Sequence, residues 1–147
     1  MQLEATDKKI LNILVDNSRL SLRKIAKKAD VSVATVMHHI KKLEKEGIIK
    51  KYTTKLDYEK TGYDVEVIIE IRISKGKLFE VEKKIAMHPN VVAVYDITGK
   101  ADILLIGKFK NRDELSHFIK SISAIPNVEN TETHIVLNTI KEDFRLS

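Results

Sequence analysis

The chain has 147 residues and a formal net charge of +5, contains no cysteine, and is 43% hydrophobic. This length suits one ordinary domain or two small ones, and the lack of cysteine excludes a disulfide framework and a thiolate metal site. The longest apolar runs are too short to span a bilayer and residues 1–7 lack the features of a signal peptide, so we expect a soluble cytoplasmic protein without membrane contact.

The first third of the chain has the pattern of three short amphipathic helices. Thr6 is expected to cap the first helix, which ends at Asn17–Ser18. Ser21 is expected to cap the second helix, and the third is expected to occupy Ser32–Glu46 and to stop at Gly47. A short turn between the last two helices predicts a helix-turn-helix, in which the third helix buries Val36, Ile40 and Leu43.

The excess of positive charge is confined to the first half of the chain. Residues 1–64 hold 14 basic and 9 acidic residues, whereas residues 65–147 hold 12 of each. Between Arg19 and Lys51 there are ten basic residues and three acidic ones. Because each neutralised phosphate releases condensed counterions, this segregation predicts contact with double-stranded DNA, with Ser32–Glu46 in the major groove.

A polar segment separates this region from the rest of the chain. Residues 48–57 alternate as an extended segment, in which Lys50 and Lys51 are positioned either to touch DNA as a wing or to lead away from it, and residues 58–64 are turn-like. We therefore expect a winged-helix-like domain over 1–57, a linker over 58–64 and a second domain over 65–147.

The second domain contains an internal repeat with an offset of 37 residues, which relates Pro89-Asn90-Val91 to Pro126-Asn127-Val128. Strands are expected at 65–74, 91–98, 102–110 and 128–137, and helices at 77–87 and 112–123. Two strand-helix-strand units in tandem predict a βαββαβ, ferredoxin-like sandwich with both helices on one face, so the chain is of the α+β class.

The first strand of this sandwich is apolar on both faces. Val67, Ile69, Ile71 and Ile73 lie on one side and Ile68 lies on the other. Because the helices cover only one face of the sheet, the other face needs a second cover. We therefore expect a homodimer that is formed through the sheets.

The order of motifs resembles the Lrp/AsnC (feast/famine) family of transcription regulators. The motifs are DKKIL at 7–11, SLRKIAKKA at 21–29, SVATVMHHIKKLEKEGII at 32–49 and TGKAD at 98–102. The resemblance implies a regulator that binds DNA, dimerises, often assembles into octamers, and responds to an amino acid or similar small molecule through a RAM/ACT-like domain. The family usually has glycine where this chain has Asp30, and often arginine where it has His39.

The candidate DNA-contacting residues fall into two groups. Those expected to face the groove are Ser32, Thr35, His38, His39 and Lys42. Those expected to contact phosphates are Arg23, Lys24, Lys27, Lys28, Lys41, Lys50 and Lys51. Adjacent histidines on a helix point about 100° apart, which does not suit a shared metal ion, so we expect no metal and no other cofactor.

The resemblance places the effector site at the Gly99–Asp102 turn. A carboxylate beside free backbone amides can hold an α-amino group and a carboxylate at once. The candidate effector-binding residues are Thr98, Gly99, Asp102, Ser121, Ile125, Asn127, Thr131, Thr133 and His134.

Three other functions compete with this interpretation. An RNA-binding βαββαβ module needs stacking aromatic residues on its middle strands, and residues 102–110 offer only Phe109. An architectural protein would bind DNA by charge with little sequence specificity. A tetrapyrrole-acting enzyme of similar architecture would use histidines in the second domain, but no catalytic arrangement stands out, and we expect no enzymatic activity.

Overall fold

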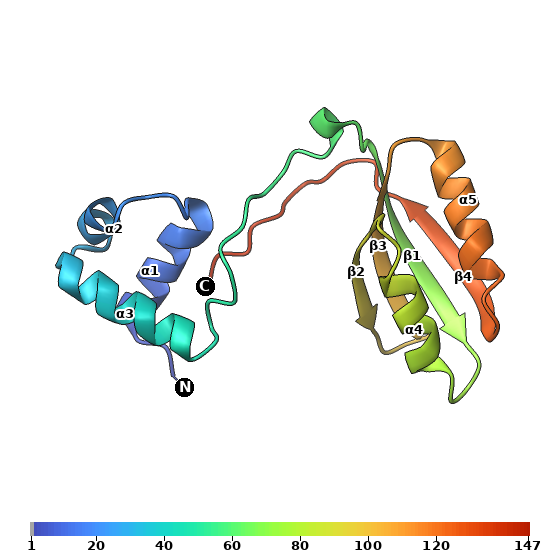
Figure 1. Ribbon diagram of the computed structural model, residues 1–147, viewed down its shortest axis with the longest axis horizontal. Coiled ribbons are helices and arrows are strands. Elements are labelled where there is room, and N and C mark those ends of the chain that lie inside the picture. The colour runs from blue at the N-terminus through green and yellow to red at the C-terminus, as the bar shows by residue number, and fades with distance from the viewer. Residues whose placement is uncertain (1) are drawn as a thin grey trace. The chain divides into compact units, whose positions relative to one another are not determined.

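The computed structural model describes residues 2–147, which form two compact units (Figure 1). The helical unit comprises the chain as far as Lys55 together with Ile140–Ser147, and the sheet unit comprises Leu56–Thr139. The last eight residues therefore differ from the expected boundaries, because they belong with the helices rather than with the domain expected over 65–147. None of the helices within residues 2–147 is long and apolar enough to cross a membrane.

The helical unit contains α1 (Ala5–Asp16), α2 (Leu22–Ala29) and α3 (Val33–Lys45). The hydroxyl of Ser21 accepts a hydrogen bond from the Lys24 amide, and that of Ser32 accepts one from the Thr35 amide, so both expected serines cap their helices. The apolar faces of the three helices meet in a small core, whose buried members are Ile10, Ile25, Ala26, Ala29 and Val36.

Two local features differ from the sequence pattern. The N-cap of α1 is Glu4 rather than Thr6, because the Asp7 carboxylate accepts a hydrogen bond from the Glu4 amide at 2.9 Å. The helical pattern of α2 puts Leu22 on the same face as Ile25 and Ala26, but Leu22 is 38% exposed at the start of the helix. Asp30 ends α2 in the left-handed conformation, with φ 59° and ψ 50°, and this residue makes the turn toward α3.

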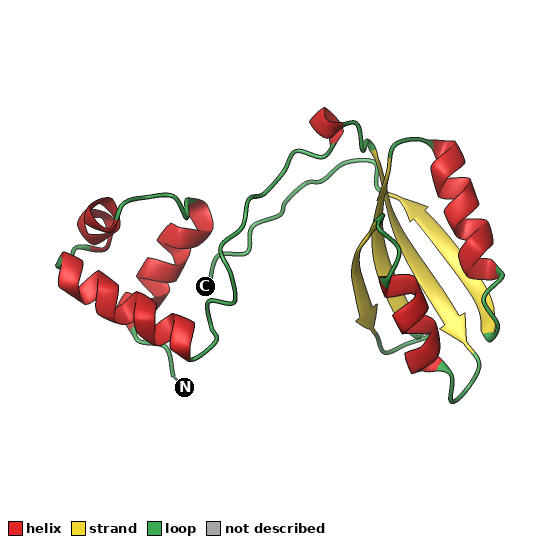
Figure 2. Ribbon diagram, in the orientation of Figure 1, coloured by secondary structure: helices red, strands yellow, loops and turns green. Residues whose placement is uncertain are grey.

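The sheet unit contains the 3-10 helix η1 (Glu59–Thr61), α4 (Leu78–Ala86), α5 (Arg112–Ser123) and four strands. The strands are β1 (Val65–Ile73), β2 (Val91–Asp96), β3 (Ile103–Phe109) and β4 (Val128–Ile135). They form one antiparallel sheet in the order β2-β3-β1-β4, with the helices on one face (Figure 2). This is the ferredoxin-like arrangement that the repeat predicts.

The two copies of the Pro-Asn-Val turn make equivalent backbone hydrogen bonds. The Asn90 carbonyl accepts a hydrogen bond from the Lys108 amide at 2.9 Å, and the Asn127 carbonyl accepts one from the Ser74 amide at 2.9 Å. Each asparagine thus joins the start of its own strand to the neighbouring strand.

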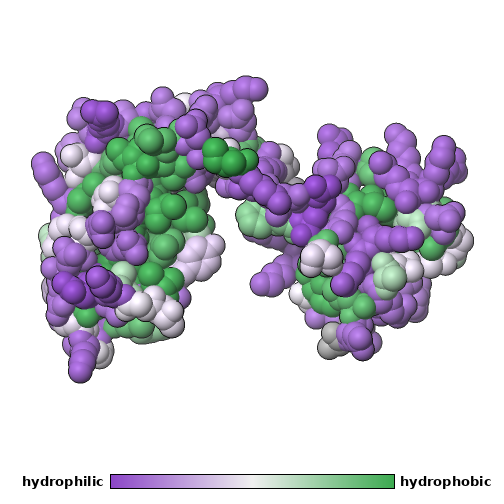
Figure 3. Space-filling view, turned by 180° about the vertical axis from the view of Figure 1, so that it is seen from behind, coloured by the Kyte–Doolittle hydropathy of each residue, from purple (hydrophilic) through white to green (hydrophobic). Residues whose placement is uncertain are grey.

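The face of the sheet opposite α4 and α5 is uncovered within the sheet unit. β1 directs Val67, Ile69 and Ile71 into the core, where they are fully buried. The other face carries apolar side chains on three strands, namely Ile68, Ala93, Tyr95, Leu104 and Ile106. Seen from behind, the sheet unit presents a broad apolar area on this face (Figure 3). We call these five residues the open face.

Candidate nucleic-acid interface and ligand site

The charge of the molecule divides sharply between the two units. Residues 1–55 hold 13 basic and 6 acidic residues and residues 140–147 hold two of each, so the helical unit carries +7. The 11 basic and 13 acidic residues of 56–139 give the sheet unit −2. The helical unit is therefore the part of the chain that a polyanion attracts.

The cations expected at phosphates are all exposed in the helical unit. None of them forms an ion pair within residues 2–147, which leaves their charge uncompensated at short range. They are Arg23, Lys24, Lys27 and Lys28 on α2, Lys41 on α3, and Lys50 and Lys51 in the segment after α3.

The outer face of α3 is a stripe of exposed residues opposite the buried Val36 and Leu43. Its members recur at spacings of three and four, which places them on one side of the helix, and they are Ala34, His38, Lys41 and Lys45. Ser32 is exposed at the N-terminal end of this stripe, and Thr35 is half-buried beside it. Sequence reasoning missed Ala34 and Lys45, although their spacing from His38 was the signal that could have found them.

His39 and Lys42 do not have the roles expected of them. His39 is 7% exposed, and its Nδ1 lies 2.6 Å from Oδ1 of the buried Asp7 on α1. Lys42 is half-buried, with its Nζ 3.1 Å from the Asp7 carboxylate and 3.2 Å from Oε1 of Glu4. A groove-facing role for His39 is therefore wrong, because the side chain is enclosed between α1 and α3, and the ammonium of Lys42 is already ion-paired.

Asp7 is the centre of this α1–α3 contact. Burial by itself raises the pKa of Asp7, but hydrogen bonds from His39, the Glu4 amide and Lys42 outweigh burial, and the pKa lies below its usual value. The same contact raises the pKa of Lys42, chiefly through its hydrogen bond to Asp7. Asp7 is thus a buried carboxylate that holds the rotation of α3 against α1.

The segment after α3 has no strand partner among residues 2–147 and folds back on α3 by a side-chain contact. Tyr52 Oη donates a hydrogen bond to Glu44 Oε1 at 2.7 Å. Burial and this contact raise the pKa of Tyr52 to about 12. The wing-like segment that presents Lys50 and Lys51 is therefore extended, but it is not part of a sheet.

Two candidate effector residues meet at the end of β1. Asp102 Oδ2 accepts a hydrogen bond from the Ile73 amide at 2.8 Å, and the Asn127 carbonyl accepts one from the next amide, that of Ser74. Gly99, with φ 107°, lies in the loop that leads to Asp102, and Thr98 is exposed beside it. The Asp102 carboxylate is therefore partly engaged in the fold, because one of its two oxygens accepts a backbone hydrogen bond.

The other candidate effector residues do not share one surface. Ile125 packs against the core of the sheet unit, and the Ser121 hydroxyl donates to the Phe118 carbonyl within α5. Thr131 and Thr133 pair with Ile71 and Ile69 on the helix-covered side of the sheet, as the register of the strands shows.

His134 lies on the other side of the sheet, because it pairs with Ile68. Its Nε2 lies 3.0 Å from Glu70 Oε2. Within one chain, His134 and Thr133 therefore face opposite sides of the sheet.

Comparison with known proteins matches each part of the chain to a known family model. Residues 3–50 match the family model described as winged helix-turn-helix DNA-binding, and residues 66–146 match the model described as Lrp/AsnC ligand binding domain. An uncharacterized HTH-type transcriptional regulator of Pyrococcus horikoshii is 49% identical over 146 residues, which are 99% of each chain. HTH-type transcriptional regulator FL11 of the same organism is 39% identical over 98% of this chain and 95% of its own.

A solved structure supports the same assignment. The complex of transcriptional regulator NMB0573 from Neisseria meningitidis with L-methionine is 27% identical, covers 99% of this chain and 97% of its own, and superposes with a TM-score of 0.91. The fold and the family expected from the motifs are confirmed. The chain belongs to the Lrp/AsnC family, and it is a DNA-binding transcriptional regulator with a ligand-binding domain.

Proposed function

We propose that this regulator reads duplex DNA with Ser32 and the outer face of α3, while the exposed cations of α2 and of residues 50–51 contact phosphates. The observation that carries the proposal is the +7 charge of the helical unit, in which the exposed cations of α2 and of residues 50–51 form no ion pair within residues 2–147. Ser32, Ala34 and His38 lie in the N-terminal half of α3, which is the part of a recognition helix that contacts base edges.

Binding to selected and to random duplexes tests this proposal. At one physiological salt concentration, a duplex selected from a random pool is expected to bind at least about 10³-fold more tightly than random DNA. Equal affinities would instead support the architectural alternative. The double variant His38→Ala/Lys41→Ala is expected to weaken binding to the selected duplex, whereas Lys9→Ala, which removes an exposed cation from α1, serves as the matched control.

The open face is the proposed dimer interface. Its apolar residues on adjacent strands are unpartnered within the sheet unit, and a second copy supplies a surface of the same shape and polarity. A symmetric dimer would place two α3 helices about 34 Å apart, in successive major grooves. Leu104→Lys is expected to shift the mass measured by light scattering from dimer to monomer, and an unchanged mass would argue against this interface.

The proposed effector is an amino acid held at the end of β1. The free oxygen of Asp102 would accept the α-ammonium group, and exposed amides of the 98–101 loop would hold the α-carboxylate. The complex of the Neisseria relative with L-methionine supports this ligand class. Ligand binding would shift the assembly equilibrium and thereby change DNA affinity by linkage.

Asp102→Asn separates the ligand role of this residue from its structural role. The amide oxygen still accepts the Ile73 N–H, but the charge that attracts an ammonium group is gone. Calorimetric titration with L-methionine and a panel of other amino acids is expected to show loss of binding in Asp102→Asn. The exposed Asp96→Asn on β2 should retain it. Undiminished binding to Asp102→Asn would place the site elsewhere.

A further inference from the structure

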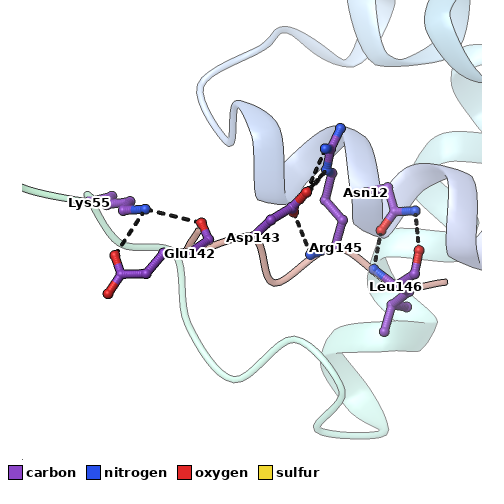
Figure 4. A network of polar contacts seen from close by, with 6 residues as sticks. All are labelled: Asn12, Lys55, Glu142, Asp143, Arg145 and Leu146. Atoms are coloured by element: carbon purple, nitrogen blue, oxygen red, sulfur yellow. Dashed lines mark hydrogen bonds and ion pairs between the residues drawn. The ribbon is translucent and has the colours of Figure 1, made fainter. Parts of the chain in front are cut away.

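The outer side of α1 holds the segment Ile140–Ser147 by its main chain. Asn12 Nδ2 donates a hydrogen bond to the Leu146 carbonyl at 3.0 Å, and the Leu146 amide donates to Asn12 Oδ1 at 2.7 Å (Figure 4). One turn earlier, Lys8 Nζ lies 3.3 Å from the Ser147 carbonyl oxygen. A side-chain amide that pairs with both polar groups of one residue recognises an extended peptide rather than a particular side chain.

Further contacts fix the rest of this segment. Lys55 Nζ lies 3.3 Å from the Glu142 carbonyl oxygen and 3.3 Å from its Oε2 (Figure 4). Arg145 donates to Asp143 through its amide, Nε and Nη2, and these bonds lower the pKa of Asp143 to about 2. A hollow lies between the segment and α1, lined on the α1 side by Asn12, Ile13 and Asp16.

The charges within the segment cancel. Lys141 and Arg145 balance Glu142 and Asp143, so docking leaves the +7 charge of the helical unit unchanged. Any effect of the segment on DNA binding must therefore act through position and order rather than through attraction to phosphates. In this respect the segment differs from the exposed cations on α2, which would act on DNA binding through their charge.

We propose that α1 carries a peptide-docking site whose ligand is Ile140–Ser147 of the same chain, and that its engagement sets the affinity of the helical unit for DNA. The chain then passes between the two units twice, at Lys55–Leu56 and at Thr139–Ile140 (Figure 1). With the segment released, the helical unit is attached by one crossing alone, and more conformational freedom is lost when both helical units of a dimer bind one operator. The effect on affinity rests on the proposed DNA-binding function, whereas the docking does not.

Amide hydrogen exchange in the full-length protein tests the docking directly. The Leu146 amide is expected to be protected in the wild type, and Asn12→Ala should reduce its protection about tenfold, which corresponds to about 1.4 kcal/mol. Leu146→Pro removes the donor N–H without changing α1. Because proline has no amide proton to exchange, this variant is read in the DNA-binding measurement below, where it tests the same contact if Asn12→Ala disturbs the helix. Asn138→Ala is the control, because this exposed asparagine forms no hydrogen bond within residues 2–147.

DNA affinity measured over a series of salt concentrations tests the consequence. Asn12→Ala and Leu146→Pro are expected to bind the selected duplex about 3- to 10-fold more weakly at every salt concentration, with an unchanged salt slope. Exchange of the wild-type Leu146 amide at the rate of a free peptide would overturn the docking site. Protection of Leu146 together with undiminished DNA binding by both variants would overturn its effect on affinity. If the wild type bound no duplex, the proposed function would fail while the exchange result still decided the docking.

Discussion

Asp7→Ala is expected to destabilise the helical unit more than any exposed substitution on the same helix. The change leaves the buried Nδ1 of His39 without its partner at 2.6 Å, which costs about 1–3 kcal/mol, and removes the acceptor of the Glu4 amide, which costs about 1 kcal/mol. Lys42 is half-buried and its ammonium can turn to water, so loss of the Lys42–Asp7 ion pair adds little to the destabilisation. The expected decrease in the free energy of unfolding is about 2–4 kcal/mol, or a fall in Tm of roughly 10–25 °C for a unit of this size.

Differential scanning calorimetry at neutral pH measures this change, since the two units are able to unfold in separate transitions. Lys9→Ala is the control, because it removes an exposed charged side chain from α1 that forms no ion pair within residues 2–147. Its Tm should stay within about 2 °C of the wild type. Equal Tm values for Asp7→Ala and Lys9→Ala would refute the idea that the buried carboxylate holds α3.

The pH dependence of the same measurement has a definite sign. Because the folded-state pKa of Asp7 lies below the ordinary value of 3.8, its ionised form stabilises the fold at every pH above that value. The contribution is lost as the pH falls through the lower, folded-state pKa. The difference in Tm between the wild type and Asp7→Ala is therefore expected to be constant from about pH 5 upward and to narrow in strong acid.

Three further substitutions test separate parts of the molecule. Asp30→Gly should raise the denaturation midpoint of the helical unit, with a gain of roughly 0.5–1 kcal/mol, because glycine adopts the left-handed conformation at φ 59° without a Cβ clash; a lower midpoint would contradict this. Gly107→Ala would place a Cβ 2.8 Å from Phe109 Cε2. The free energy of unfolding of the sheet unit alone should therefore fall by about 1–3 kcal/mol, which calorimetry would show as a lower transition temperature for that unit. Lys27→Ala/Lys28→Ala should reduce the slope of log affinity against log salt by about 1–2, whereas an unchanged slope would show that neither lysine contacts a phosphate.

Local signals in the sequence predict the elements well. Ser21 and Ser32 act as N-caps, and the helix expected at 112–123 has those bounds in the structure, because a cap and an apolar stripe depend only on neighbours along one helix. The strands of the repeat are likewise local features, and their alternation sets which face each residue joins. Thr6 was misassigned because Glu4 and Asp7 form the competing cap.

Contacts between distant, polar segments leave no such signal. The 140–147 segment has no apolar periodicity, and its main chain pairs with Asn12, which lies 134 positions away from Leu146. The effector site shows the same limit. The register of β4 puts Thr133 and His134 on opposite faces, but only the pairing of β4 with β1 shows which face is covered. Spacing along the chain therefore does not show which of these candidate residues share one surface of the sheet.

The buried position of His39 could have been predicted by considering the patterns of α1 and α3 together. It lies three residues after Val36 and four before Leu43, so helical spacing puts it on the buried stripe of α3. Asp7 lies three residues before Ile10 on the buried stripe of α1. Two complementary polar residues on facing apolar stripes predict a buried pair, because either one alone would be costly to bury. With His39 enclosed, the base contacts that we propose for α3 are left to Ser32, Ala34 and His38, which are exposed near its N-terminus.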